Sequence, residues 1–166
     1  MGSKSDLEFA ERISATLGSY AIPTDLRIAS AHRTPEYLLK LIHDYAESGD
    51  QIVIVTIAGL SDALSGVVAA QRLFPVIACP PDIEKHNFPK IFSSAFTPPD
   101  VPVAFVNDPA KAAHLVAQIF ALGNKQLAST ILARVAEKKN LIAREDEQLQ
   151  SIEIERKSEN KHEHFA

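Results

Sequence analysis

The pattern of apolar and polar residues divides the chain into alternating helical and extended segments. Apolar residues at helical spacing predict helices that begin near Ser5, Thr34, Asp62 and Asp108. Between them, runs rich in β-branched residues predict strands over 23–28, 52–57, 76–79 and 103–106. This alternation is typical of a three-layer α/β domain with a parallel sheet.

The last part of the chain has a different pattern. After a main domain over residues 1–123, residues 124–157 predict one long, charged helix, and residues 158–166 are expected to form a disordered tail. Apolar residues recur along this helix every three or four residues, or at multiples of that spacing: Leu127, Ile131, Val135, Ile142 and Leu149. Because such a stripe needs a partner surface, we expect the helix to serve oligomerisation.

The chain opens on a helix signal without a strand before it. An α/β domain that begins with Gly2-Ser3-Lys4-Ser5-Asp6 normally has a strand leading into that turn. We therefore expect either that the chain continues upstream or that another segment fills the position of that strand.

Composition narrows the class of protein. The chain has 166 residues, of which 46% are apolar and 23% charged, and this fits one globular domain. Its formal net charge of −4 argues against a general affinity for nucleic acid or anionic membranes. No apolar run approaches the roughly 18 residues of a membrane span, and the polar residues 1–6 are not expected to belong to a signal peptide. Cys79 is the single cysteine, so no intrachain disulfide forms and a cytoplasmic setting is expected.

Candidate chemistry lies in the turns after the strands, because ligands of parallel α/β folds bind at the carboxyl ends of the strands. The turn after 23–28 combines Ser30, His32 and Arg33 directly before the helix that starts at Thr34. A hydroxyl, a guanidinium and a helix N-terminus together suit a phosphate, and an imidazole beside them titrates near neutral pH, as proton transfer requires. We favour this functional interpretation over a histidine that only caps a neighbouring group.

Two other turns and the cysteine are more ambiguous. The hydroxyls and free N–H groups of residues 2–6 suit a phosphate or sugar hydroxyls, but taken alone the segment is better explained as a helix cap. The small residues of 58–66 fit close approach to a ring and tight helix packing equally well. Cys79 has no basic neighbour in the sequence to lower its pKa, so we interpret it as a small buried apolar residue rather than a nucleophile. The sequence contains no zinc-ligand spacing, P-loop or dinucleotide-binding motif.

Together these motifs resemble a known family. Gly2–Asp6, then Ser30-Ala31-His32-Arg33-Thr34-Pro35, then the Ala58-Gly59 loop, in this order and spacing, are similar to the catalytic subunits of phosphoribosylaminoimidazole carboxylase from purine biosynthesis. The resemblance runs from residue 2 to about residue 125. It implies a flavodoxin-like fold, a cytoplasmic homo-octamer contacted through the C-terminal helix, and a reaction on a ribonucleotide and carbon dioxide without metal, biotin, ATP or another cofactor.

The resemblance also implies roles for individual residues. His32 takes the C4 proton of the substrate and returns it in the reverse reaction. The implied substrate-binding set is Ser3, Ser5, Asp6, Ser30, Arg33, Gly59, Leu60 and Ser61. Within this set Ser3, Asp6, Ser30 and Arg33 hold the ribose 5-phosphate, with Asp6 on the ribose hydroxyls. The backbone of Gly59, Leu60 and Ser61 contacts the imidazole and the carboxylate.

The family has two branches, and the sequence resembles the branch that carboxylates aminoimidazole ribonucleotide directly with carbon dioxide. The similarity lies in Ala63-Leu64-Ser65-Gly66, in Cys79-Pro80-Pro81 and in the Ile-Phe-Ala-Leu segment at 119–122. Four residues depart from that branch: Leu60 and Phe96, where arginine is usual, Asp62, where asparagine is usual, and Arg33, where lysine is frequent. Two alternatives remain: the mutase branch, which rearranges an N-carboxylated ribonucleotide and carries a histidine in the loop after Gly59, and a nucleotide-binding paralogue that is non-catalytic or differently specific.

Overall fold

The computed structural model describes residues 1–59, 61–81 and 89–163. The chain forms two compact units, one over Met1–Phe120 and the other from Ala121 onward. The first unit is built on a parallel sheet, and the second is dominated by a single helix. Each unit is described by itself.

The sheet of the first unit has three parallel strands in the order β1-β2-β3. The strands are β1 (Ile54–Thr56), β2 (Val76–Ala78) and β3 (Ala104–Phe105). Val55 lies opposite Ile77, and Ile77 lies opposite Ala104. Each strand falls inside a predicted extended run and is shorter than that run.

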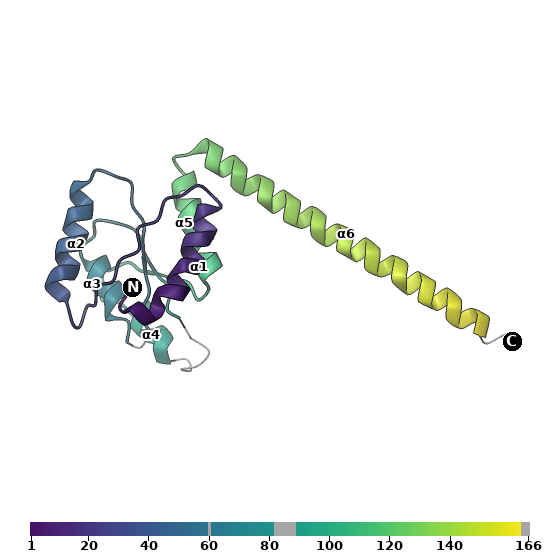
Figure 1. The fold of residues 1–166 in the computed structure, drawn as a ribbon, viewed down its shortest axis with the longest axis horizontal. Helices are drawn as coiled ribbons and strands as arrows, with labels where there is room; N and C mark the ends of the chain where they lie inside the picture. The colour runs from purple at the N-terminus through teal and green to yellow at the C-terminus, as the bar shows by residue number, and fades with distance from the viewer. Residues whose placement is uncertain (60, 82–88, 164–166) are drawn as a thin grey trace. The chain divides into compact units, whose positions relative to one another are not determined.

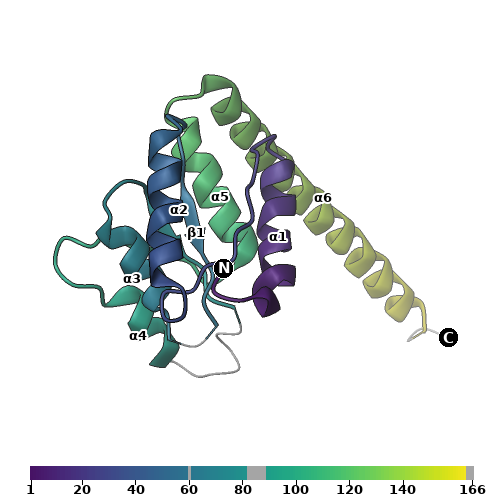
Figure 2. The ribbon, with the colours of Figure 1, turned by 60° about the vertical axis from the view of Figure 1, so that its left-hand side comes forward.

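Helices cover both faces of this sheet (Figures 1 and 2). The first face carries α1 (Leu7–Gly18) and α5 (Pro109–Ala121), and Ile13 and Val116 from these helices share a core with Ile77. The second face carries α2 (Pro35–Glu47) and α3 (Ala63–Ala70), which share a core with Val76. Consecutive residues of a strand point to opposite faces, so β2 contributes to both cores. This arrangement confirms the predicted three-layer α/β fold.

The strand predicted over 23–28 is not formed. Residues 22–30 belong to no helix or strand, although they follow α1 as expected. Their backbone is bonded near its two ends: Ile22 N donates to Leu17 O (3.1 Å), and toward the other end the amino group of Met1 donates to the carbonyl oxygen of Arg27 (2.8 Å) and Ala29 N donates to Met1 O (3.0 Å). A strand forms only where a neighbouring segment hydrogen-bonds to its backbone, and the pattern of residues within the strand does not show whether such a segment is present.

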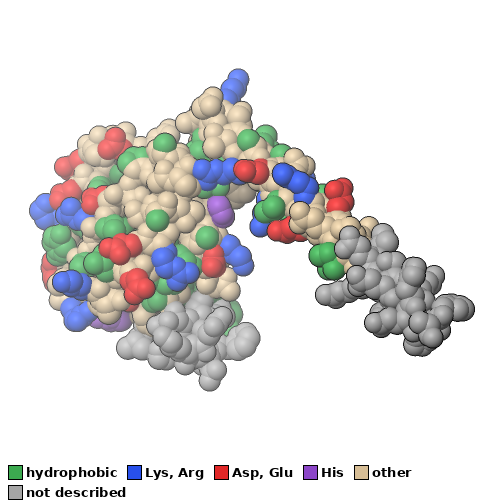
Figure 3. Space-filling model, turned by 45° about the vertical axis from the view of Figure 1, so that its right-hand side comes forward, with side chains coloured by type: hydrophobic (Ala, Val, Ile, Leu, Met, Phe, Trp, Pro, Cys, Tyr) green, Lys and Arg blue, Asp and Glu red, His purple; other side chains and the backbone are tan. Residues whose placement is uncertain are grey.

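The second unit contains α6, which spans Lys125–Glu163. Asn124 caps it, because its side-chain oxygen accepts from Leu127 N (3.0 Å). The helix extends past residue 157, since neither glycine nor proline interrupts the sequence that follows. Val135, Ile142 and Leu149 of the predicted stripe are exposed, and hydrophobic side chains lie among charged ones along this helix in Figure 3. Among the described helices, none combines the length and the apolar character that crossing a membrane demands.

Candidate functional site

Three turns meet beside the carboxyl end of β1. The N-terminal turn contacts the residue that follows β1, because Gly2 N–H donates to Ile57 O (2.9 Å). The turn before α2 contacts Gly2 as well, because the guanidinium of Arg33 donates to Gly2 O (3.2 Å). Gly59 lies beside the N-terminal turn as well, because a Cβ atom placed on it falls 3.7 Å from a carboxylate oxygen of Asp6. The structure therefore brings together three segments that are about 25 to 30 residues apart in the sequence.

The N-terminal turn forms the 3-10 helix η1 (Lys4–Asp6), which runs into α1. Ser3 caps it by accepting from Ser5 N (3.1 Å), and the hydroxyls of Ser3 and Ser5 are 2.5 Å apart. The Ser5 hydroxyl also lies 3.4 Å from the carboxylate of Asp6, which is buried. The three predicted binding residues thus form one connected cluster of oxygen atoms. The capping box expected from Ser5 and Glu8 is not formed: Ser3 caps η1, and Asp6, at the N-cap position of α1, makes no side-chain cap hydrogen bond.

The turn at residues 30–34 is held by a short set of local hydrogen bonds. Thr34 does not cap α2 with its side chain; its hydroxyl instead bonds the backbone of Ser30, accepting from Ser30 N at 3.0 Å and lying 3.3 Å from Ser30 O. Ser30 Oγ in turn accepts from Arg33 N (3.2 Å). These bonds fix the backbone on either side of His32, whose side chain is exposed and makes no hydrogen bond or ion pair within the described chain. The imidazole is therefore available for proton transfer.

Arg33 has donors to spare. A guanidinium carries five N–H donors, and within the described residues its side chain makes one hydrogen bond, to Gly2 O. The side chain is exposed, so the remaining donors can reach an anionic group at this edge. Among the described residues, no three side chains of the metal-binding types gather in one place.

Part of the turn after β1 lies outside the residues that the structure describes. Leu60 lies outside the described residues, and Ser61 is exposed. The next residue, Asp62, is 3% exposed and caps α3. Its carboxylate accepts from Ser65 N (3.0 Å), from Ser65 Oγ (2.7 Å) and from Ser94 Oγ (2.6 Å).

Asp62 also ties two helices together. Ser94 belongs to α4 (Pro89–Ala95), and Asp62 N donates to the hydroxyl of its neighbour Ser93 (3.1 Å). Asp62, Ser65, Ser93 and Ser94 are referred to below as the Asp62 cluster. A carboxylate buried in this cluster is held by the protein itself and does not face a ligand as a free charge.

The remaining residues that the sequence singled out, Cys79, Phe96 and His86, are not part of the three turns. Cys79 is fully buried, and burial, with the negative charge of Asp108 adding to it, raises the pKa of its thiol to about 12. A thiol that stays protonated and has no access to solvent is not a nucleophile, which agrees with its interpretation as a buried apolar residue. Phe96 is 74% exposed and lies with its ring 5.3 Å from that of Phe92. His86 lies outside the described residues.

The sequence analysis missed how the turns are tied to one another. It did not anticipate the bond from Thr34 to Ser30 or the buried contacts of Asp62 with Ser94. The sequence does indicate the contact between Asp62 and Ser65, because these two residues have the spacing of an N-cap residue and the third helical position. No sequence signal connects Asp62 with Ser94, which follows in the chain only after β2 and the segment 82–88.

Comparison with known proteins gives consistent matches over most of the chain. A family model described as AIR carboxylase matches residues 1–140. Phosphoribosylaminoimidazole carboxylase of Archaeoglobus fulgidus is 41% identical over 149 residues, which cover 90% of this chain and 82% of that protein. N5-carboxyaminoimidazole ribonucleotide mutase of Methanocaldococcus jannaschii is 34% identical over 154 residues, or 92% of this chain and 96% of that one.

A solved structure shows the same likeness in three dimensions. The crystal structure of Treponema denticola PurE aligns with a TM-score of 0.85 at 34% sequence identity. The alignment covers 90% of this chain and 94% of that chain. The similarity thus extends beyond the three turns to the fold that positions them.

Proposed function

The chain belongs to the AIR carboxylase family, and from this premise we propose that it adds carbon dioxide to C4 of 5-aminoimidazole ribonucleotide in purine biosynthesis. The observation that carries the proposal is the meeting of the turns at 2–6, 30–34 and 57–59 in a chain whose residues 1–140 match the family model. The enzyme is then a carboxy-lyase, and its reverse reaction is a decarboxylation.

The proposed division of labour follows the chemistry of each group. Arg33 and Ser30 hold the 5-phosphate, because a guanidinium with spare donors and a hydroxyl beside a helix N-terminus suit that dianion. Ser3, Ser5 and Asp6 bind the ribose side, where a carboxylate accepts hydrogen bonds from sugar hydroxyls. The backbone of 59–61 lies against the imidazole and the carboxylate, and Gly59 leaves room there.

The proposed reaction requires little beyond positioning and one proton transfer. The substrate is an enamine, so its C4 carbon is nucleophilic and attacks the carbon of carbon dioxide to form the new carbon–carbon bond. His32 then removes the proton from C4, which restores the aromatic ring and leaves the product carboxylate. The same imidazole returns the proton when the reaction runs in reverse.

The mutase reaction is the second candidate. It draws support from the similarity to the Methanocaldococcus jannaschii mutase, which is as extensive along the chain as that to the carboxylase of Archaeoglobus fulgidus. Against it stands the turn after β1, which has Gly59, Leu60 and Ser61 and no histidine. The burial of Asp62 further supports the carboxylase, because its carboxylate is held by serines and so does not repel the product.

One assay separates these activities. Purified protein receives aminoimidazole ribonucleotide with bicarbonate and no ATP, and in a parallel reaction the N-carboxylated ribonucleotide alone. We expect carboxylated product from the first mixture. Turnover of the second substrate only would establish the mutase, and turnover of neither, with nucleotide binding retained, would establish a non-catalytic paralogue.

The proposal extends to assembly and location. The exposed apolar residues Val135, Ile142 and Leu149 support an oligomer formed partly through α6, and by family resemblance we propose a homo-octamer in the cytoplasm. Light scattering on the full chain, beside a chain that ends before Asn124, tests the assembly. A full-length monomer would contradict it.

A further inference from the structure

Exposed apolar residues lie at a regular spacing along the middle of α6. Val135, Ile142 and Leu149 are seven residues apart, so they lie on one side of the helix, and each is about half exposed. Leu132 and Ile152 extend this side, three residues before the first and three after the last, and both are exposed. The five residues span about 30 Å of helix. They are called the α6 face below.

The α6 face is symmetric about Ile142. Val135 and Leu149 lie seven residues before and after it, and Leu132 and Ile152 lie ten residues before and after it. When two copies of a helix lie antiparallel, the residues before a central position meet the residues after that position in the other copy. Two copies of α6 that meet at Ile142 therefore bring apolar residues together along the whole α6 face.

The charges along this part of α6 have opposite signs on the two sides of Ile142. The nine residues before it contain three basic side chains and one acidic one, and the nine residues after it contain one basic and three acidic. Lys138 and Lys139 lie four and three residues before Ile142. Glu145 and Asp146 lie three and four residues after it. The antiparallel arrangement thus brings the two lysines of one copy level with the two carboxylates of the other.

These four charged residues have no opposite charge within reach on their own helix. Neighbours on a helix surface are three or four residues apart, and at those spacings none of the four has an oppositely charged residue. Among the described residues, Lys138, Lys139 and Glu145 form no ion pair. Asp146 accepts a hydrogen bond from the amide of Gln150 (2.8 Å), which is uncharged.

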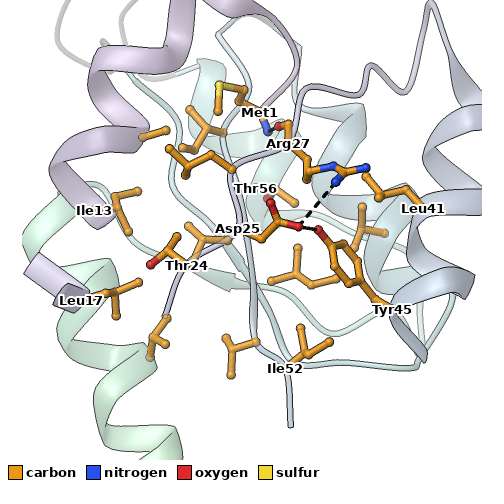
Figure 4. A pocket seen from close by; sticks show the side chains of 18 of the residues that line it. Met1, Ile13, Leu17, Thr24, Asp25, Arg27, Leu41, Tyr45, Ile52 and Thr56 are labelled. Carbon is orange, nitrogen blue, oxygen red and sulfur yellow. Dashed lines mark hydrogen bonds and ion pairs between the residues drawn. The ribbon is translucent and has the colours of Figure 1, made fainter. Parts of the chain in front are cut away.

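Charged residues of the first unit show the contrast. Lys40 of α2 forms an ion pair with Asp44, four residues further along the same helix (2.6 Å). The carboxylate of Asp25 accepts a hydrogen bond from the Tyr45 hydroxyl and lies 3.6 Å from the guanidinium of Arg27 (Figure 4). Partners there come from one helix or from a neighbouring segment. For the four charges of α6, an oppositely charged partner comes only from outside the helix.

The charges also select one orientation and one register. In a parallel pair each residue meets its own copy, so Lys139 lies beside Lys139 and Glu145 beside Glu145, and such like charges repel. An antiparallel pair that is shifted by one heptad places Leu132 level with Glu145, or Ile152 level with Lys139. Only the register centred on Ile142 matches the apolar residues and the charges together.

We propose that α6 pairs with α6 of a second copy of this chain, antiparallel and about a two-fold axis at Ile142. The pair covers the α6 face of each copy with that of the other. It also places Lys138 and Lys139 of each copy against Glu145 and Asp146 of the other, so that the contact has charge-complementary pairs on both sides of its centre.

The pair is one contact within the assembly proposed above, and it rests on that oligomer and not on the enzymatic activity. The match to the family model ends at residue 140, whereas the acidic half of the contact and three of the five residues of the α6 face follow that position. Membership of the family therefore does not imply this contact, which depends on the chain's own sequence after residue 140.

Disulfide crosslinking between two full-length chains tests the orientation and the register. Val135→Cys and Leu149→Cys are made in chains with different tags, and the two chains are co-expressed and mildly oxidised. We expect the disulfide between positions 135 and 149 to form at least about tenfold faster than a disulfide between identical chains. The reason is that two copies of position 135 lie about 21 Å apart in the proposed pair, beyond the reach of a disulfide. Cys79 is buried and does not compete.

Charge reversal in these cysteine chains tests the role of the ion pairs. Lys138→Glu with Lys139→Glu in both chains is expected to slow the mixed disulfide at least about tenfold, because like charges then face each other. Adding Glu145→Lys with Asp146→Lys exchanges the signs and is expected to restore the rate. The matched control reverses two other acidic residues at helical positions away from the α6 face, Glu137 and Glu147, and is expected to leave the rate within about twofold.

Three results would overturn the proposal. Faster disulfides between identical chains than between positions 135 and 149 would show a parallel pair. Equal slowing by the control reversal would show that the lysines and carboxylates act only through net charge. An assembly that persists in light scattering without the mixed disulfide would show that α6 contacts another part of its neighbour, and this result would leave the proposed oligomer standing. A monomer would refute the pair and the oligomer together.

Discussion

Two polar clusters lie at the starts of α2 and α3, and they differ in what their side chains are free to do. In the turn at 30–34, hydrogen bonds hold the backbone and leave the side chains of His32 and Arg33 exposed. In the Asp62 cluster, the carboxylate itself receives the hydrogen bonds, and Asp62, Ser65 and Ser94 are buried. A position at a helix start therefore does not by itself make a polar cluster a ligand site; the side chains must also be left available to the ligand.

The largest effect is expected from removing the imidazole of the turn at 30–34, referred to below as the open cluster; the Asp62 cluster is the closed one. His32→Asn is expected to lower turnover by roughly a hundredfold or more, the range of lost general acid–base catalysis, while the urea midpoint stays unchanged. Steady-state kinetics and urea unfolding measure the two effects. The matched control is His43→Asn, since His43 is an exposed histidine of α2. Near-normal turnover of the His32 variant would refute its role.

The closed cluster is expected to show the opposite behaviour. Asp62→Ala leaves buried hydroxyls of Ser65 and Ser94 without their acceptor and removes the cap of α3, so the free energy of unfolding is expected to fall by about 2–3 kcal/mol. Urea unfolding measures this, and Asp62→Asn, which keeps one acceptor oxygen, serves as the milder variant. Unchanged stability of Asp62→Ala would show that the cluster is not structural.

Arg33 tests whether the open cluster binds the phosphate. Arg33→Ala is expected to weaken ribonucleotide binding roughly thirtyfold, about 2 kcal/mol, as for a lost charge-assisted hydrogen bond. Calorimetric titration measures the affinity, with Lys4→Ala as the control because Lys4 is a neighbouring exposed cation. If the unmodified protein binds the nucleotide and its dephosphorylated nucleoside equally well, the assignment of Arg33 is wrong.

The smallest effect is expected from Cys79, whose thiol is ionisable but buried. The pKa of Cys79 is raised from 9.0 to about 12 by burial, so the unfolded chain loses this proton first as pH rises. Stability is therefore expected to fall between pH 8 and 10, by about 1 kcal/mol from this thiol. Urea unfolding across this range should show a smaller fall for Cys79→Ala. An identical pH dependence of the two proteins would place the thiol outside the linkage.

The sequence predicted the parts of the fold that depend on local pattern. The β-branched runs at 52–57 and 76–79 contain β1 and β2, and Pro35 and Pro109 stand at the starts of α2 and α5 as expected. The prediction of a strand at 23–28 was wrong, because a strand depends on hydrogen bonds to a neighbouring strand as well as on its own residues. At the site, the motifs identified the turns, but the contacts of Asp62 with Ser94 and of Arg33 with Gly2 arise only from the folded arrangement.

Gly2 connects the end of β1 with the candidate site. Its N–H donates to the carbonyl oxygen of Ile57, directly after β1, and its carbonyl oxygen accepts from the guanidinium of Arg33. The conformation of Gly2 and the orientation of Arg33 are therefore thermodynamically linked. By reciprocity, a ribonucleotide whose binding favours the bond between Arg33 and Gly2 also stabilises the attachment of the N-terminal turn to the end of β1, by the same factor as that attachment strengthens nucleotide binding.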